Sequence, residues 1–239
     1  MNPILVALDV PTAAEALTVA DTLRGAVGGY KIGSQLFTAA GPDIVRTFVD
    51  RGDPVFLDLK FHDIPNTVAG AVSSATELGV WMVNVHASGG AAMLTAARRA
   101  ADESAARTGR KAPLVIAVTV LTSMDAPTLA GVGVPSTPLD QVIRLATLAQ
   151  NAGLDGVVAS PQEIAAIRSA CGSGFAIVTP GIRGGSAASG PDDQHRTSTP
   201  AGAVSAGSSY LVIGRPITAA SDPRAAALAI LDEVQAVRA

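Results

Sequence analysis

The stretch FLDLKFHDIPNTV, residues 56–68, places charged side chains inside an otherwise apolar segment. Asp58, Lys60 and Asp63 lie among Phe, Leu and Ile residues. Removing an unpaired charge from water costs on the order of several kcal/mol, so such residues enter apolar segments only with partners. These residues therefore belong either to a structural ion pair or to a functional site at the end of a strand.

Around this stretch, short apolar runs alternate with Ala-rich segments of helical periodicity. The apolar runs are hydrophobic on both faces, which is typical of parallel strands covered by helices. We expect strands at residues 4–9, 30–33, 54–59, 81–87, 114–120, 156–160, 175–180 and 209–214. We expect helices at residues 12–26, 36–50, 65–79, 90–108, 139–152, 161–170 and 223–238. About eight such units predict an α/β protein with a closed (β/α)8 barrel, the TIM barrel, as a single domain over residues 1–239; an open doubly wound sheet is the alternative.

The composition narrows the class of protein. The chain has 239 residues, of which 48% are hydrophobic, and a net charge of −3, so it offers no electrostatic footprint for nucleic acid. Cys171 is the only cysteine, which excludes an intrachain disulfide and a multi-cysteine metal site. The N-terminal segment lacks the features of a signal peptide, and no apolar stretch is long enough to span a bilayer. We expect a cytoplasmic protein without a membrane or nucleic-acid partner.

Polar side chains gather where the expected strands end, and active sites of such barrels sit at the carboxyl ends of the strands. Two long loops, 121–138 and 181–196, follow the fifth and seventh strands, and loops of this length are usually functional lids. The polar positions, in chain order, are Asp9, Lys31, Asp58, Lys60, His86, Thr122, Ser123, Arg183, Gly214 and Arg215.

Strand alternation places Phe56, Asp58 and, if the strand continues, Lys60 on one face. A carboxylate and an amine can then share one cavity. Each residue also has a structural interpretation. Lys60 can be a loop lysine, Asp58 can form a structural ion pair with Lys60 or Lys31, and Asp63 can be a helix N-cap ahead of a proline in the first turn.

The segment LVIGRPIT, residues 211–218, predicts an anion site. Gly214 and Arg215 can offer a backbone N–H and a guanidinium to one anion, and the loops after strands seven and eight of such barrels commonly bind phosphate. Arg183 and Gln194, at the two ends of the long seventh loop, can close over the same anion. The alternative is a surface arginine in a turn.

Taken in order, these motifs resemble the orotidine 5′-phosphate decarboxylase family, whose members complete UMP synthesis. The resemblance runs nearly end to end and rests on ALD (7–9), YKIG (30–33), FLDLKFHDIPNTV (56–68), NVHASGG (84–90), TVLTS (119–123), TPGIR (179–183), DDQHR (192–196) and VIGRPIT (212–218). It implies a homodimer in which Asp63 and Thr67 reach the active site of the other subunit. It further implies a charge tetrad of Lys31, Asp58, Lys60 and Asp63, ribose contacts from Asp9 and Lys31, a pyrimidine contact from Thr122 or Ser123, and a phosphate site of Arg183, Gln194, Gly214 and Arg215.

The reaction that the resemblance implies explains the charges in the opening stretch. Loss of CO2 from C6 of orotate leaves a carbanion without an adjacent carbonyl to take up the charge. An ammonium at Lys60 can stabilise that charge and donate the proton, and Asp58 and Asp63 would keep it charged and oriented. Neither a metal nor an organic cofactor is required.

Two alternatives remain open. Sugar-phosphate decarboxylases and synthases with the same barrel share the Asp-x-Lys-x-x-Asp motif and use Mg2+, with a Glu where this chain has Lys31; a lysine there would repel the cation. The other alternative is a catalytically idle barrel that binds phosphate, although such a barrel has no physical need to bury the polar tetrad.

Overall fold

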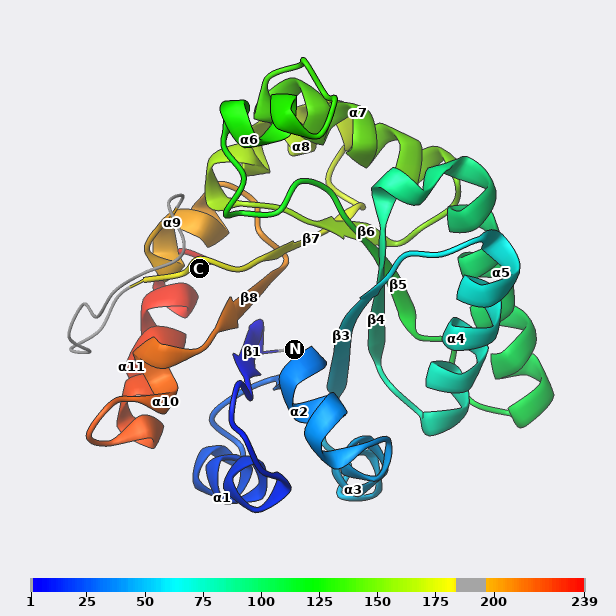
Figure 1. Ribbon diagram of the computed structural model, residues 1–239. Helices are drawn as coiled ribbons and strands as arrows, with labels where there is room; N and C mark the ends of the chain where they lie inside the picture. Colours follow the sequence, from blue (N-terminus) through cyan, green and yellow to red (C-terminus); the bar gives the residue numbers. More distant parts are fainter. Residues whose placement is uncertain (1, 184–196, 239) are drawn as a thin grey trace.

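The computed structural model describes residues 2–183 and 197–238, and these form a closed barrel of parallel strands (Figure 1). The strands follow one another around the barrel in chain order, and β1 closes the ring by pairing with β8. This closure confirms the (β/α)8 prediction and excludes the open sheet. The strands are β1 (Ile4–Ala7), β2 (Gly29–Gly33), β3 (Val55–Phe61), β4 (Met82–His86), β5 (Leu114–Val118), β6 (Gly156–Val158), β7 (Ala176–Thr179) and β8 (Tyr210–Ile213).

Helices surround this barrel on its outer side (Figure 1). Within the described residues, no helix combines the length and the apolar character needed to cross a membrane. The α-helices are α1 (Ala13–Leu23), α2 (Ser34–Ala40), α3 (Asp43–Asp50), α4 (Pro65–Leu78), α5 (Gly90–Thr108), α6 (Ala126–Gly131), α7 (Pro138–Asn151), α8 (Ile164–Cys171), α9 (Pro200–Ser205), α10 (Arg215–Thr218) and α11 (Pro223–Ala236), with 3-10 turns η1 (Ala87–Gly89) and η2 (Pro161–Glu163).

Strand alternation divides the core into two layers. One set of side chains, such as Ile4 and Val6, packs against the helices and is fully buried. The other set fills the inside of the barrel and consists of Leu5, Ala7, Phe56, Met82, Ile116, Val178 and Val212. Ala7 pairs with Lys31, and Lys31 pairs with Phe56, so the Lys31 side chain enters the same inner layer.

The amino-terminal end of the barrel is closed by aromatic side chains. Trp81, which precedes β4, meets Tyr210 of β8 edge to face, with ring centroids 5.0 Å apart. Trp81 and Tyr210 thus pack against the inner layer of the barrel. Because these rings fill the amino-terminal end of the barrel, the space beside the inner polar side chains is open at the carboxyl ends of the strands.

Some expected elements differ from the structure. The single helix expected at 36–50 is wrong, because α2 ends at Ala40 and α3 begins at Asp43. Gly41 has φ of 67° and Pro42 follows it, which interrupts the helix although the apolar periodicity continues across the break. The expected loop 121–138 contains α6, and the short helices α9 and α10 were not expected.

Candidate active site

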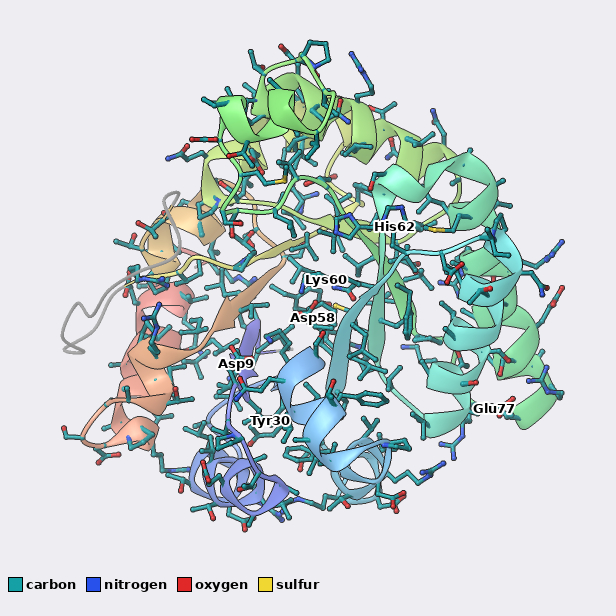
Figure 2. The ribbon with its side chains drawn as sticks, viewed as in Figure 1. Asp9, Tyr30, Asp58, Lys60, His62 and Glu77 are labelled. Carbon is teal, nitrogen blue, oxygen red and sulfur yellow. The ribbon has the colours of Figure 1, made fainter. Side chains whose placement is uncertain are left out.

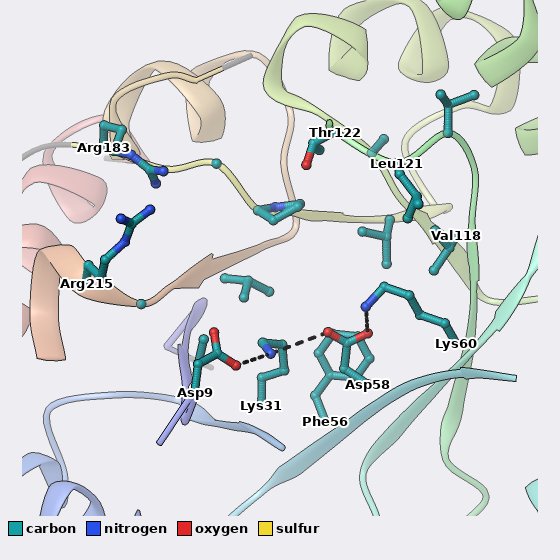
Figure 3. A pocket seen from close by; sticks show the side chains of 18 of the residues that line it. Asp9, Lys31, Phe56, Asp58, Lys60, Val118, Leu121, Thr122, Arg183 and Arg215 are labelled. Atoms are coloured by element: carbon teal, nitrogen blue, oxygen red, sulfur yellow. Dashed lines mark hydrogen bonds and ion pairs between the residues drawn. The ribbon is translucent and has the colours of Figure 1, made fainter. Parts of the chain in front are cut away.

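A cavity of about 570 Å3 opens at the carboxyl ends of the strands (Figure 3). Its residues come from β1, β2, β3, β5, β6 and β8 and from the segments that follow the strands. Figure 2 shows Asp58 and Lys60 directed toward the centre of the ring, whereas Glu77 lies on the outer layer of helices. The charged and hydroxyl-bearing residues that line the cavity are Asp9, Lys31, Asp58, Lys60, Thr122, Arg183, Arg215 and Thr218.

One wall of the cavity carries a row of alternating charges. The Lys31 ammonium lies 2.9 Å from Oδ1 of Asp9 and 3.5 Å from Oδ2 of Asp58. The Lys60 ammonium lies 2.7 Å from Oδ1 of Asp58 (Figure 3). Both lysines therefore share the Asp58 carboxylate, one on each oxygen. The ordering of Asp9, Lys31, Asp58 and Lys60 compensates charge within the protein.

Asp58 is the buried member of this row, with a side chain only 12% exposed. Burial alone would raise the pKa of the Asp58 carboxyl, but the charges of Lys31 and Lys60 and the hydrogen bonds from Lys60 and Asn84 together lower it. Asp58 is therefore held as a carboxylate in a poorly solvated place. The Lys60 side chain is 38% exposed and reaches the open part of the cavity.

Asn84 on β4 is a member of this site that the sequence reasoning missed. Its side chain is fully buried, donates to Asp58 Oδ1 at 2.6 Å and accepts from the Lys60 backbone N–H at 2.8 Å. The available signal was a single asparagine between Val83 and Val85 in an apolar strand, because a buried amide needs partners.

Phe56, Asp58 and Lys60 line the same cavity, which confirms the expectation that they share a face. The strand reaches Lys60 through an irregularity, however. The pairing of β3 with β4 shifts register between Leu57 and Phe61. Among the described residues, Lys60 is the only non-glycine with positive φ, at 52°.

The adjoining wall, after β7 and β8, carries the two arginines, and β8 is the strand that pairs with β1. Arg183 and Arg215 both line the cavity, and Figure 3 shows their guanidinium groups on the same side of it. Gly214 precedes Arg215 in the lining, as the anion-site prediction requires. Arg183 is anchored through its backbone N–H, which donates to the Ser198 carbonyl at 2.8 Å. Gln194 lies outside the described residues.

The structure separates the two hydroxyl residues that follow β5. Thr122 lines the main cavity, whereas Ser123 lines an adjacent cavity of about 510 Å3 that also includes Thr122. Thr122 is therefore the residue of this pair that faces the charged row in the described conformation.

Asp63 and Thr67 are not among the residues that line the cavity of their own chain. Both are exposed, and the Ile64 side chain between them is 67% exposed. The alternative that Asp63 caps helix α4 is wrong, because the N-cap residue is Ile64, no side chain caps the helix, and the Asp63 carboxylate accepts from the Ile64 N–H at 2.6 Å. Pro65 occupies the first turn as expected.

His86 ends β4 beside Lys60 and stacks on His62, with ring centroids 5.4 Å apart. Burial, followed by the charges of His62 and Lys60, lowers the pKa of His86. Neither histidine lines the cavity. Among residues 2–183 and 197–238, no three His, Cys, Asp or Glu side chains are grouped so that they could hold a metal ion.

Comparison with known proteins gives a consistent result. Residues 2–230 match the family model described as "Orotidine 5′-phosphate decarboxylase / HUMPS family". A protein of Moorella thermoacetica named orotidine 5′-phosphate decarboxylase is 57% identical over 99% of this chain and 94% of its own length. One from Sodalis glossinidius with the same name is 54% identical over 98% of this chain and 90% of its own. The crystal structure of orotidine 5′-phosphate decarboxylase from Lactobacillus acidophilus superposes with a TM-score of 0.87 at 36% identity, covering 98% of this chain and 99% of that one.

Proposed function

Because this chain belongs to the orotidine 5′-phosphate decarboxylase / HUMPS family, we propose that it is a carboxy-lyase that converts orotidine 5′-monophosphate to UMP. The observation that carries the proposal is one cavity lined both by the row of Asp9, Lys31, Asp58 and Lys60 and by two arginines. The row suits chemistry that develops negative charge at one carbon, and the arginines suit a phosphate. We further propose that the barrel works as one domain in the cytoplasm.

The phosphate of the nucleotide would bind between Arg183, Gly214 and Arg215. Guanidinium groups bind phosphate oxygens in pairs, which fixes both the position and the direction of the nucleotide. Gln194 is assigned to the same phosphate by the family resemblance. The ribose hydroxyls would then meet Asp9 and Lys31, and the pyrimidine would lie near Thr122, with Ser123 as the second candidate for that contact. Phosphate binding remote from the reacting carbon can stabilise the transition state by ordering the site.

Lys60 would perform the chemistry at C6 of the pyrimidine. The bond from C6 to the carboxylate breaks, its electron pair stays on C6, and CO2 leaves. The Lys60 ammonium stabilises the developing carbanion and then transfers a proton to C6, after which the lysine regains a proton from water. Asp58 holds the ammonium at 2.7 Å, so this group is oriented before the substrate arrives. This scheme uses neither a metal nor an organic cofactor.

The Asp58 carboxylate adds a second effect. It is held ionised and poorly solvated, beside the place where the substrate carboxylate would lie. Repulsion between the two carboxylates raises the energy of the bound substrate and is relieved as CO2 leaves. Lys31 and Asp58 therefore act with Lys60 as one charged unit.

We propose that the active unit is a two-fold homodimer in which Asp63 and Thr67 complete the site of the partner. Two observations support this proposal. Both residues are exposed and do not line the cavity of their own chain, and the intervening Ile64 exposes an apolar side chain that an interface would bury. The completed row would then place a second carboxylate beside Lys60.

A Mg2+-dependent enzyme of the same barrel group is the competing function. Lys31 argues against it, because its ammonium lies 2.9 Å from Asp9 and 3.5 Å from Asp58, between the carboxylates that a divalent ion would use. A non-catalytic phosphate-binding barrel is opposed by the charged row itself, because binding a phosphate does not require partly buried carboxylates and ammonium groups.

An absorbance assay tests these functions. The orotate chromophore should be lost when orotidine 5′-monophosphate is added to the protein, at the same rate before and after exhaustive treatment with EDTA. Activity that disappears with EDTA and returns with Mg2+ would move the chain to the metal-dependent group. No loss of absorbance in either sample, with nucleotide binding intact, would favour the idle barrel.

A further inference from the structure

The segment that carries Asp58 and Lys60 is not held by the ordinary ladder of the barrel. On the β4 side of β3, Leu57 pairs with Val83, and the next recorded pair is Phe61 with Val85. Residues 58–60 of β3 therefore face Asn84 alone. Such a bulge re-aims side chains and leaves backbone groups in need of other partners.

Lys60 adopts an unusual backbone conformation within this bulge. Its φ of 52° lies in the left-handed region, which costs an L-residue on the order of 1 kcal/mol. The surrounding contacts have to hold this conformation in place. Its backbone N–H donates at 2.8 Å to the Asn84 side chain, not to a strand carbonyl.

Asn84 satisfies both sides of the bulge with one amide. The backbone N–H of Lys60 can only donate and the Asp58 carboxylate can only accept, so the amide oxygen must face Lys60 and the amide nitrogen must face Asp58. The amide donates to Oδ1 of Asp58, the oxygen that also accepts from the Lys60 ammonium. The fully buried Asn84 amide thus holds both the bulge at residues 58–60 and the Asp58 carboxylate that binds the Lys60 ammonium.

We propose that Asn84 is a positioning residue for the decarboxylation. It holds the Lys60 backbone in the left-handed conformation and orients Asp58, so that the ammonium projects into the cavity. The proposal rests on the proposed function, since it concerns how the reacting group is placed. Displacing a reacting group by about 1 Å can cost about 100-fold in rate, which makes such positioning measurable.

The variant Asn84→Asp tests this proposal because it keeps the shape of the side chain and changes one hydrogen bond. The new carboxyl still accepts from the Lys60 N–H. It donates to Asp58 only when protonated, and burial beside another carboxylate raises the pKa of the introduced group. Below that pKa the donor is present; as pH rises through it, the donor is lost and two carboxylates repel each other.

The expected result is a change in kcat with little change in nucleotide affinity. At pH 8, kcat of Asn84→Asp should fall by about 100-fold, while the dissociation constant for UMP stays within about threefold. The ratio of variant to wild-type kcat should rise as pH is lowered. A ratio independent of pH, or equal losses in kcat and in UMP affinity, would overturn the proposal in favour of a structural role.

Thr179→Val provides the matched control. Thr179 is also fully buried in a barrel strand, its side chain hydrogen-bonds to that of Ser208 at 2.8 Å, and it does not line the cavity. This variant should lower stability without producing the pH-dependent ratio. If it reproduces the kinetic change of Asn84→Asp, buried polar groups in general account for the effect and the proposal fails.

A measurement on the wild-type protein covers the case in which Asn84→Asp does not fold. Amide hydrogen exchange should show the Lys60 N–H protected, in contrast to the Ile64 N–H, whose recorded partner is an exposed carboxylate. Equal, rapid exchange at both amides would overturn the proposal. The wild-type absorbance assay separates the two hypotheses: an inactive wild type refutes the function, whereas an active wild type with a kinetically normal Asn84→Asp refutes only the role of Asn84.

Discussion

The two walls of the cavity handle charge in opposite ways. The wall after β1–β3 alternates carboxylates and ammonium groups at separations of 2.7 to 3.5 Å. Among the described lining residues, the charged groups of the wall after β7 and β8 are the guanidinium groups of Arg183 and Arg215. The charges of the first wall thus alternate in sign, whereas the described charged groups of the second wall are both cationic.

This difference separates two tasks. A compensated row can be held rigid before substrate binds, because each charge has a partner, and rigid placement is what stabilises a charge that develops only in the transition state. Two guanidinium groups on one wall suit an anionic ligand, because guanidinium groups bind phosphate oxygens in pairs. We therefore propose that the wall after β1–β3 carries out the chemistry and that the wall after β7 and β8 binds phosphate, and four predictions test that division.

Lys60→Ala should produce the largest effect. It removes the ammonium that would stabilise and protonate C6, so kcat should fall by more than about 1000-fold, or roughly 4 kcal/mol of barrier. UMP binding and the thermal unfolding temperature should change little, because the cationic wall is intact. The control is Lys111→Ala, which removes an exposed lysine that does not line the cavity and should leave the protein active.

A Lys60→Ala variant that keeps a rate within about tenfold of wild type would break the division, since that loss is only roughly 1.4 kcal/mol. Lys60 could then be neither the main stabiliser nor the proton donor.

Arg215→Ala should come next. It removes one cation from the second wall, so kcat/KM for the nucleotide should fall by about 100-fold, or roughly 2.7 kcal/mol. Orotidine, which lacks the phosphate, should lose less than about threefold under the same change. Arg46→Ala, which removes an exposed arginine paired with Asp43 at 2.8 Å, is the control. Equal losses with both substrates would place Arg215 outside the phosphate site.

These predictions draw on features that differ in how visible they are in the sequence. The barrel follows from the repeated apolar runs, and the shared face of Asp58 and Lys60 follows from the two-residue period of a strand. Each of these patterns lies within one segment of the sequence, so it can be identified without knowing which strands are neighbours in the sheet.

Asn84 shows where sequence reasoning stops. An asparagine between two valines predicts a buried amide, but its partners depend on a register shift between β3 and β4. That register shift depends on how the two strands pair, so the sequence of either strand alone does not predict it. The break between α2 and α3 is different, because the Gly41–Pro42 pair that ends α2 is visible in the sequence, although the apolar periodicity continues past it.

The third prediction concerns the stability of the compensated wall without substrate. The lowered pKa of Asp58, ordinarily 3.8, means that the folded protein favours the carboxylate. This contribution to the free energy of unfolding is present above the unfolded pKa and is lost as pH falls through the folded one, at about 1.4 kcal/mol per unit of lowering. Asn does not titrate. The free energy of unfolding of the wild type minus that of Asp58→Asn should therefore be constant from pH 7 to about 5 and should decrease below about pH 4.

Urea unfolding of both proteins across this range measures the difference. A difference that grows on acidification would mean that burial outweighs Lys31 and Lys60, and that the wall is not compensated.

The fourth prediction, with the smallest expected effect, tests whether one chain supplies all the charged residues of the first wall. If Asp63 serves the partner, Lys60→Ala and Asp63→Ala should each be nearly inactive alone. In a mixed two-fold dimer, one site receives both altered residues, and the other receives an intact Lys60 from one chain and an intact Asp63 from its partner. Asp63 then behaves as a member of the first wall that is contributed across an interface.

Random exchange at equal concentrations makes about half of the dimers mixed, each with one intact site of two, so about a quarter of wild-type activity should return. That quarter is only a fourfold deficit, or roughly 0.8 kcal/mol, but it is measured against two inactive parents. A dye-labelled mixing control establishes that subunits exchange. If they exchange and activity stays at zero, every site keeps one defect, and Asp63 must act within its own chain. The exposed position of Asp63, away from the cavity of its own chain, would then require a movement of the segment after β3 to bring it beside Lys60.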